Sequence, residues 1–159
     1  MSRSPEIEAL ALALVGRWSG TGTVSYPTIE TFEYREEFVV SERSDHPALH
    51  IDQRTWKQTE DDEVPSHWET GLLRLSSDGT ARFLNAQGGR AEAMDGGWRP
   101  TAVGWEISLA SHDYAGDTRV VRSSRRYEVG PNRIGYRMSM ATTNVPDLTA
   151  HLSASLTRS

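Results

Sequence analysis

The chain has 159 residues, of which 36% are hydrophobic and 25% are charged, and this balance favours one folded domain, residues 1–159, over a disordered chain. Its formal net charge of −5 argues against a nucleic-acid or anionic-membrane partner, since both require a basic face. The absence of cysteine excludes disulfides, thiolate-bound metals and thiol catalysis, and the absence of a secretion signal or long apolar stretch leads us to expect a cytoplasmic protein.

A short helix is predicted near the N-terminus. Ser4 can cap it, and Pro5 suits the first helical position, where a backbone N–H would have no partner. Apolar residues then recur on one stripe, which Gly16 ends: Ile7, Leu10, Ala11 and Leu14. A short amphipathic helix of this kind is expected to lie against a larger body.

From Gly16 onwards the sequence is typical of strands and turns. Between Phe32 and Val40, for example, apolar and polar residues alternate with a period of two. The predicted strands cover residues 17–25, 32–40, 49–57, 68–75, 81–86, 90–98, 103–111, 119–129, 133–141 and 148–156. Turn signals occur at residues 77–79, 95–97, 113–116 and 130–132, and the acidic run at 60–63 is most simply a solvated loop tip.

No long helical pattern separates these strands, which argues against parallel βαβ units. We therefore predict an all-β fold, an antiparallel up-and-down β-barrel of about ten strands with the short N-terminal helix. A two-sheet sandwich is the structural alternative. Because barrels of about eight strands are just filled by their side chains, a larger one is expected to contain a ligand cavity.

The densest local pattern is the glycine-rich run from Gly16 to Gly22. Its glycines alternate with larger residues and share one strand face, and their spacing does not match the dinucleotide-binding fingerprint. Glycine on a strand usually marks a bend or a close approach of backbone. The run predicts a strand that closes the barrel, with Trp18 plugging one end, and Pro27 and Thr28 form a corner after it.

The histidines show none of the spacings of a zinc site. His46 and His112 are predicted at the surface, whereas His67 stands beside a predicted strand and can face a cavity. His151 lies on the last predicted strand among small and apolar residues.

The usual hydrolase motifs are absent as well. No nucleophile elbow, P-loop or paired catalytic carboxylate is found, and the neighbours Glu36 and Glu37 fall on opposite strand faces. Any chemistry is therefore expected to come from a bound cofactor.

Several short motifs occur in a fixed order along the chain. They are G-x-W-x-G-x-G at 16–22, Y-P-T at 26–28, F-x-Y-x-E-E at 32–37, T-W-K at 55–57, H-x-E-x-G at 67–71, N-A-Q at 85–87, M-S-M-A-T-T at 138–143 and L-T-A-H-L at 148–152. This series resembles that of the nitrobindin family, and it covers nearly the whole chain. The order of the motifs carries the resemblance, since each is weak alone.

The resemblance implies a ten-stranded barrel like that of the fatty-acid-binding proteins, with one b-type haem per chain. The histidine of the family's final L-x-x-H motif ligates the haem iron, and His151 occupies that position here. The other pocket residues that the resemblance implies are Thr28, His67, Gln87, Met138 and Met140.

The resemblance also implies a function. Family members bind nitric oxide on ferrous haem and isomerise peroxynitrite to nitrate on ferric haem, so both small molecules are expected ligands, and family habit implies a homodimer. Two other functions remain open for the same cavity. One is a haem-free carrier of a small hydrophobic ligand, and the other is a haem-based nitric-oxide sensor.

His151 departs from the family pattern in two ways. Pro146 stands five residues before it, one more than is usual in the family. In addition, Leu148, Leu152 and Leu156 share one face of the last predicted strand, and His151 alternates onto the other. Simple amphipathicity therefore directs the leucines inward and His151 outward. A β-bulge near Pro146, or a cavity lined by small residues with the leucines packed outside, would reconcile the two.

Overall fold

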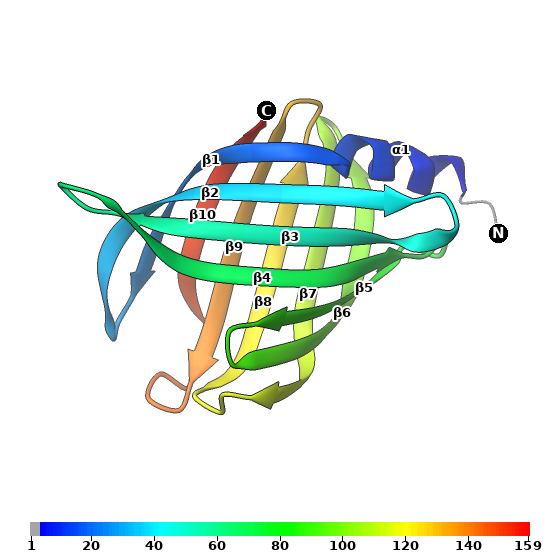
Figure 1. Ribbon diagram of the computed structural model, residues 1–159. Coiled ribbons are helices and arrows are strands. Elements are labelled where there is room, and N and C mark those ends of the chain that lie inside the picture. The colour runs from blue at the N-terminus through cyan, green and yellow to red at the C-terminus, as the bar shows by residue number, and fades with distance from the viewer. Residues whose placement is uncertain (1–3) are drawn as a thin grey trace.

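The computed structural model describes residues 4–159, so the part of the secretion-signal prediction that concerns residues 1–3 lies outside the described residues. Within this range there are one helix and ten strands (Figure 1). In chain order they are α1 (Pro5–Leu14), β1 (Gly16–Tyr26), β2 (Ile29–Arg43), β3 (His46–Gln58), β4 (Glu63–Leu75), β5 (Thr80–Gln87), β6 (Arg90–Thr101), β7 (Gly104–Gly116), β8 (Val120–Val129), β9 (Arg133–Thr142) and β10 (Thr149–Arg158).

The strands form a closed antiparallel barrel. Their order around it is β1-β10-β9-β8-β7-β6-β5-β4-β3-β2, so strands that follow each other in sequence are neighbours and β1 closes the ring on β10. This confirms the predicted up-and-down barrel and excludes the two-sheet sandwich. The acidic run at 60–63 is exposed at the tip of the β3–β4 hairpin, which projects from the barrel (Figure 1).

Two of the predicted turns are wrong. Residues 95–97 lie inside β6, and residues 113–116 belong to the end of β7. A Cβ atom on Gly96 would lie 1.8 Å from the carbonyl oxygen of Ser108, so this glycine allows β6 to approach β7 closely instead of turning the chain. The chain reverses after Gly116, which has a positive φ of 92°.

Helix α1 closes one end of the barrel. The Ser4 side chain caps it by accepting a hydrogen bond from the backbone N–H of Ile7, as predicted. The Trp18 indole donates to the carbonyl of Leu14 at 2.8 Å, and the Arg158 guanidinium stacks on the Trp18 ring at 4.2 Å. Trp18 therefore joins the helix to the β1–β10 seam, and it plugs this end as the sequence indicated.

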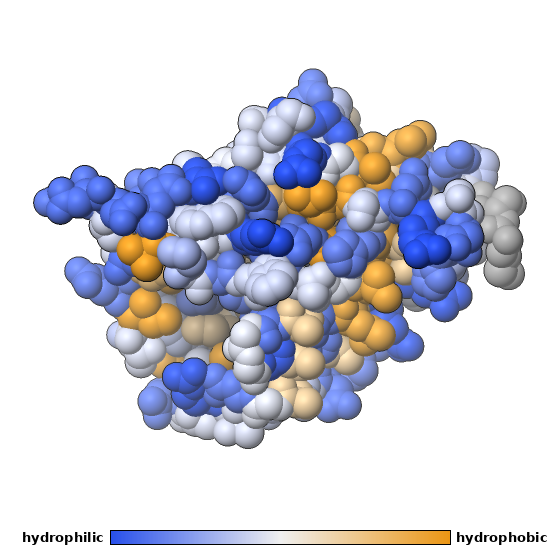
Figure 2. All heavy atoms as spheres, viewed as in Figure 1, coloured by the Kyte–Doolittle hydropathy of each residue, from blue (hydrophilic) through white to orange (hydrophobic). Residues whose placement is uncertain are grey.

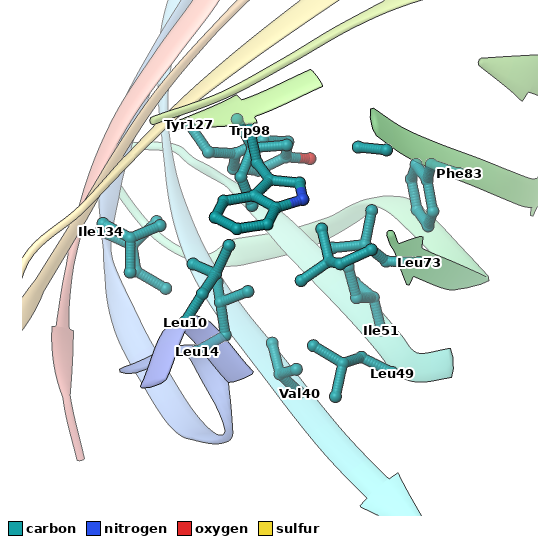
Figure 3. Close-up of a cluster of buried hydrophobic side chains, with 14 of the residues drawn as sticks. Leu10, Leu14, Val40, Leu49, Ile51, Leu73, Phe83, Trp98, Tyr127 and Ile134 are labelled. Atoms are coloured by element: carbon teal, nitrogen blue, oxygen red, sulfur yellow. The ribbon is translucent and has the colours of Figure 1, made fainter. Parts of the chain in front are cut away.

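The apolar core fills the half of the barrel nearest to α1. Leu10 and Leu14 point from the helix into a cluster supplied by strands all around the barrel (Figure 3). Other members of this cluster are Val40, Leu49, Ile51, Leu73, Phe83, Trp98, Tyr127 and Ile134. Burial of these side chains is the main source of stability for the fold.

The outer surface in the view of Figure 2 is dominated by hydrophilic residues, with hydrophobic side chains gathered beside α1. Leu12, on the outer side of α1, is 64% exposed. None of the helices in residues 4–159 has the length and hydropathy that a membrane span requires.

The β1–β10 seam provides a test of why glycine is needed in the run from Gly16 to Gly22. A Cβ atom on Gly20 would lie 2.1 Å from the backbone carbonyl oxygen of Ser155. We expect Gly20→Ala to lower the free energy of unfolding by about 1–3 kcal/mol, because overpacking of this kind forces backbone shifts. Urea denaturation measures the change. Gly88→Ala is the matched control, since no atom lies within 4 Å of its added Cβ. Equal stability of the two variants would contradict the close approach.

Candidate functional site

The half of the barrel away from α1 contains a cavity of about 560 Å³. This volume lies in the range of sites for small molecules and cofactors. Its lining includes all of the pocket residues expected from the sequence, which are Thr28, His67, Gln87, Met138, Met140 and His151. The structure thus brings together residues from the β1–β2 turn and from β4, β5, β9 and β10, and their roles toward a cofactor stay predictions.

A β-bulge in β10 places His151 inside the barrel. Ala150 pairs with Ser139 of β9, and the next pair is Leu152 with Met138, so β10 has one residue more than β9 at this point. A bulge of this kind turns two successive side chains to the same side. His151 and Leu152 accordingly both line the cavity.

This bulge resolves the conflict between the leucines and the histidine. Beyond the bulge, Leu152, Ala154 and Leu156 face inward, and the bulge residue His151 faces inward as well. The irregularity lies at His151 itself and not near Pro146, and Leu148 is exposed ahead of the strand. Simple alternation was therefore right about Leu152 and Leu156 and wrong about His151.

The His151 ring is held with little hydrogen bonding. Tyr26 contacts it edge to face, with ring centroids 5.4 Å apart. Its Nδ1 atom is buried and has no hydrogen-bond partner among the described residues. Burial, and secondarily the proximity of His67, lower the pKa of His151 below its usual value. The imidazole is therefore neutral near pH 7 and retains a lone pair for a metal or a hydrogen-bond donor.

The wall of the cavity around His151 is mostly apolar. It is formed by the contiguous strands β9, β10, β1 and β2. Its apolar side chains are Val24, Phe32, Met138, Met140 and Leu152. A flat apolar molecule can lie against this wall with His151 at its face.

The opposite wall, from β3 to β6 and from β8, is polar and charged. Arg125 donates to Glu69 through both terminal nitrogens, with an Nη2–Oε2 distance of 2.7 Å, and its Nη2 lies 3.5 Å from Glu92 Oε2. Arg90 donates in turn to Glu92 Oε1 at 2.8 Å. All four side chains are buried. Two cations and two carboxylates thus balance each other, as buried charges require.

Glu69 stays ionised in this wall. Burial by itself would raise its pKa, but the charge of Arg125 and hydrogen bonds from His67 and Arg125 lower the pKa to about 2. His67 Nε2 lies 3.5 Å from Glu69 Oε2, so the half-exposed His67 connects the buried pair to the cavity mouth.

A second buried network lies at the floor of the cavity. Glu36 Oε2 is 2.6 Å from the Tyr136 hydroxyl, which is 3.0 Å from the Tyr34 hydroxyl. Gln53 donates to Glu36 Oε1 and to the Tyr136 oxygen, both at 2.9 Å. Burial raises the pKa of Glu36 to about 8, against the opposing effect of these hydrogen bonds. Glu36 is therefore mostly neutral near pH 7.

Sequence reasoning missed both networks, although the signal was present. Glu36 lies two residues from both Tyr34 and Phe38 and so shares their inward face. Arg125 shares the inward face of Tyr127 and Val129 for the same reason. The period-two pattern placed these charged residues on the dry face of their strands. Their burial, with Glu36 0% and Arg125 4% exposed, depends on partners from other strands that this local pattern does not show.

The pKa of Glu36 predicts how stability changes with pH. A carboxyl whose pKa rises from 4.5 to about 8 on folding stabilises the fold fully below pH 4.5, and this contribution is lost as the pH rises toward 8. We expect the wild type to lose up to about 1.4 kcal/mol per pH unit in this window relative to Glu36→Gln. Urea unfolding at pH 5 to 8 measures the difference. Glu37→Gln, on the outer face, should follow the wild type, and equal slopes for all three proteins would contradict the buried acid.

The chain is similar in sequence to known proteins. The model of the family described as "THAP4-like, heme-binding beta-barrel domain" matches residues 7–158. Peroxynitrite isomerase Rv2717c of Arabidopsis thaliana is 34% identical over 144 residues, which cover 90% of this chain and 83% of the relative. Peroxynitrite isomerase 2 of Mycobacterium marinum is 34% identical over 159 residues, which cover 97% and 95%.

Solved structures agree with these sequence matches. The crystal structure of Rv2717c from M. tuberculosis superposes with a TM-score of 0.87 at 30% identity, covering 99% of both chains. The phycobiliprotein lyase CPES of Guillardia theta shares the fold alone, with a TM-score of 0.60 at 12% identity. By its sequence and its ten-stranded barrel, the chain belongs to the THAP4-like haem-binding β-barrel family, which includes relatives named peroxynitrite isomerase, as the resemblance to nitrobindins predicted.

Proposed function

We propose that the protein binds one b-type haem per chain through His151, converts peroxynitrite to nitrate on the ferric haem and binds nitric oxide on the ferrous haem. The observation that carries the proposal is the bulge that turns the His151 side chain into the cavity, with no hydrogen-bond partner for its buried Nδ1 among residues 4–159. The names of the relatives supply the reaction.

The lining of the cavity fits a haem better than a bare metal ion. Within residues 4–159, no group of three or more His, Asp or Glu side chains is placed to hold a metal. A single neutral histidine suffices for haem iron, because the porphyrin supplies the other ligands. The apolar wall beside His151, with Val24, Phe32 and Leu152, suits the porphyrin face.

The proposed reaction asks little acid–base chemistry of the protein. Peroxynitrite and nitrate have the same atoms and the same charge, so no proton acceptor or leaving-group partner is required. The iron of a bound haem supplies the site at which the oxidant is rearranged. His151 would hold the haem iron, and the apolar wall would limit water beside the reactants. The absence of a hydrolase motif agrees with this division of labour.

Replacement of His151 tests the assignment of the ligand. In hemin titrations, His151→Gly should lose the Soret shift of the wild type because the iron loses its protein ligand, and added imidazole should restore part of it. His112→Ala is the matched control, since His112 lies on the outer face with Nε2 3.2 Å from Asp95 Oδ2. A Soret band in the His151 variant that matches the wild type without imidazole would contradict the assignment.

Peroxynitrite decay, followed by stopped-flow absorbance, tests the reaction. We expect the haem-loaded protein to accelerate the decay and to yield nitrate, and the haem-free protein to leave the decay at its spontaneous rate. Saturable haem binding without acceleration would favour the sensor. A protein that shows no saturable hemin titration would favour the haem-free carrier.

A further inference from the structure

The four polar side chains at the floor of the cavity form a chain of hydrogen bonds that ends at the cavity. Tyr34, Gln53 and Tyr136 line the cavity, and Glu36 lies behind them with 0% exposure. Within residues 4–159, the only hydrogen bond of the Tyr34 hydroxyl is the one with Tyr136. The direction of this bond decides what Tyr34 offers to a molecule in the cavity.

The network has one labile proton, which belongs to Glu36. Burial raises the pKa of both Tyr34 and Tyr136, so the two phenols keep their protons. The groups that interact with Glu36 are Tyr136 from β9, Gln53 from β3, Glu69 from β4, Arg125 and Tyr127 from β8, and Tyr34 from its own strand. Burial, together with the charge of Glu69, outweighs the opposing effects of Tyr136, Gln53 and Arg125, and the Glu36 pKa is about 8.

With Glu36 neutral, the number of protons available sets the direction of each hydrogen bond in the network. Gln53 donates to Glu36 Oε1, so we place the acid proton on Oε2. The 2.6 Å contact with Tyr136, in which an ionised Glu36 accepts from the phenol, then runs in the other direction, and Oε2 donates to the Tyr136 oxygen. That oxygen also accepts from Gln53, which fills both of its acceptor positions. The Tyr136 hydroxyl must then donate to the Tyr34 oxygen. Among residues 4–159 no acceptor remains for the Tyr34 proton, which is then available to the cavity.

With Glu36 ionised, the chain reverses. The Tyr136 hydroxyl donates to the Glu36 carboxylate, and its oxygen accepts from Gln53 and from Tyr34. Tyr34 then has no proton for the cavity and presents only a lone pair. The protonation of Glu36 therefore decides whether Tyr34 donates to or accepts from a bound molecule.

A glycine of the β1 run makes room for this phenol. A Cβ atom on Gly22 would lie 2.4 Å from the Tyr34 hydroxyl oxygen and 2.3 Å from its Cζ. The absence of a side chain at Gly22 thus allows the Tyr34 ring and its hydroxyl to lie against β1, and Tyr34 is one of the residues that line the cavity. This gives a second reason for glycine in a run that otherwise closes the barrel.

We propose that Tyr34 is a hydrogen-bond donor to the small ligand held in the cavity, and that Glu36 and Tyr136 are positioning residues that direct its proton there. The ligand class is a small molecule with an exposed acceptor atom, such as a nitrogen oxide or oxyanion. The identity of that ligand rests on the proposed function. The hydrogen-bond direction rests on the network alone.

The first arm of the test uses the haem-free protein. Infrared difference spectra between wild type and Glu36→Gln should show the carbonyl band of a neutral carboxylic acid at pH 6, and this band should disappear as the pH rises to 9.5. Glu37→Gln should not remove it. Absence of the band at pH 6 overturns the inference whether or not haem binds.

The second arm uses the ferrous haem-loaded protein with carbon monoxide, a neutral probe whose stretching frequency falls when a donor approaches its oxygen. At pH 6, Tyr34→Phe should raise this frequency above that of the wild type, whereas Tyr114→Phe should not. Raising the pH to 9.5 should raise the frequency in the wild type. In Glu36→Gln it should stay low at both pH values, because the introduced side-chain amide does not titrate and continues to donate to Tyr136.

Different results would contradict the proposed haem binding and the proposed donor role of Tyr34. If haem does not load, the proposed function is contradicted, and the infrared band still decides the protonation of Glu36. If haem loads and the wild type, Tyr34→Phe and Tyr114→Phe give the same carbon monoxide frequency, the donor role of Tyr34 is overturned while haem binding stands. Circular dichroism of each variant confirms that it is folded before these measurements.

Discussion

One additional residue in β10 determines the chemistry of the cavity. Without the bulge between Ala150 and Leu152, strict alternation would let either His151 or the leucines of β10 face inward, but not both. The bulge allows Leu156 to remain in the apolar core while His151, earlier on the same strand, reaches the cavity. The same strand, β10, also pairs with β1 to close the barrel. The position of the imidazole is thus set by backbone register and not by its own hydrogen bonds.

The barrel divides its interior between stability and function. The half beside α1 is filled by apolar side chains, and this half supplies the hydrophobic stabilisation. The cavity half instead buries charged and titratable groups: Glu36 lies with Gln53 and Tyr136, and Glu69 and Glu92 lie with Arg125. Such groups are poor contributors to stability. The cavity thus has an apolar wall beside His151, a charged wall from β3 to β6 and β8, and the polar network of Tyr34, Glu36 and Tyr136 at its floor.

Much of the fold was predictable from the sequence because alternation and turn chemistry are local properties. The helix cap at Ser4, the succession of strands and the closing strand around Trp18 all follow from patterns a few residues long. The turns predicted at 95–97 and 113–116 were wrong because the glycines there allow neighbouring strands to approach closely. A Cβ atom on Gly116, for example, would lie 2.2 Å from the carbonyl oxygen of Gly89. Packing between strands is not visible in a single strand.

The candidate site shows the same limit. The order of the motifs indicated the six pocket residues that line the cavity, including His151. It did not indicate how His151 turns inward, because a bulge depends on pairing with β9. It also did not reveal that Glu36 and Arg125 meet partners from strands distant in sequence, such as Gln53 and Glu69. Those contacts require the closed barrel.

We propose that the β10 bulge presents His151 to haem iron. The most direct measurement is a crystal structure of the protein after loading with hemin. We expect one haem in the cavity, with the iron bonded to a ring nitrogen of His151 and the porphyrin against the apolar wall of β9, β10, β1 and β2. A haem held by another residue, or His151 turned out of the cavity with the bulge absent, would contradict it.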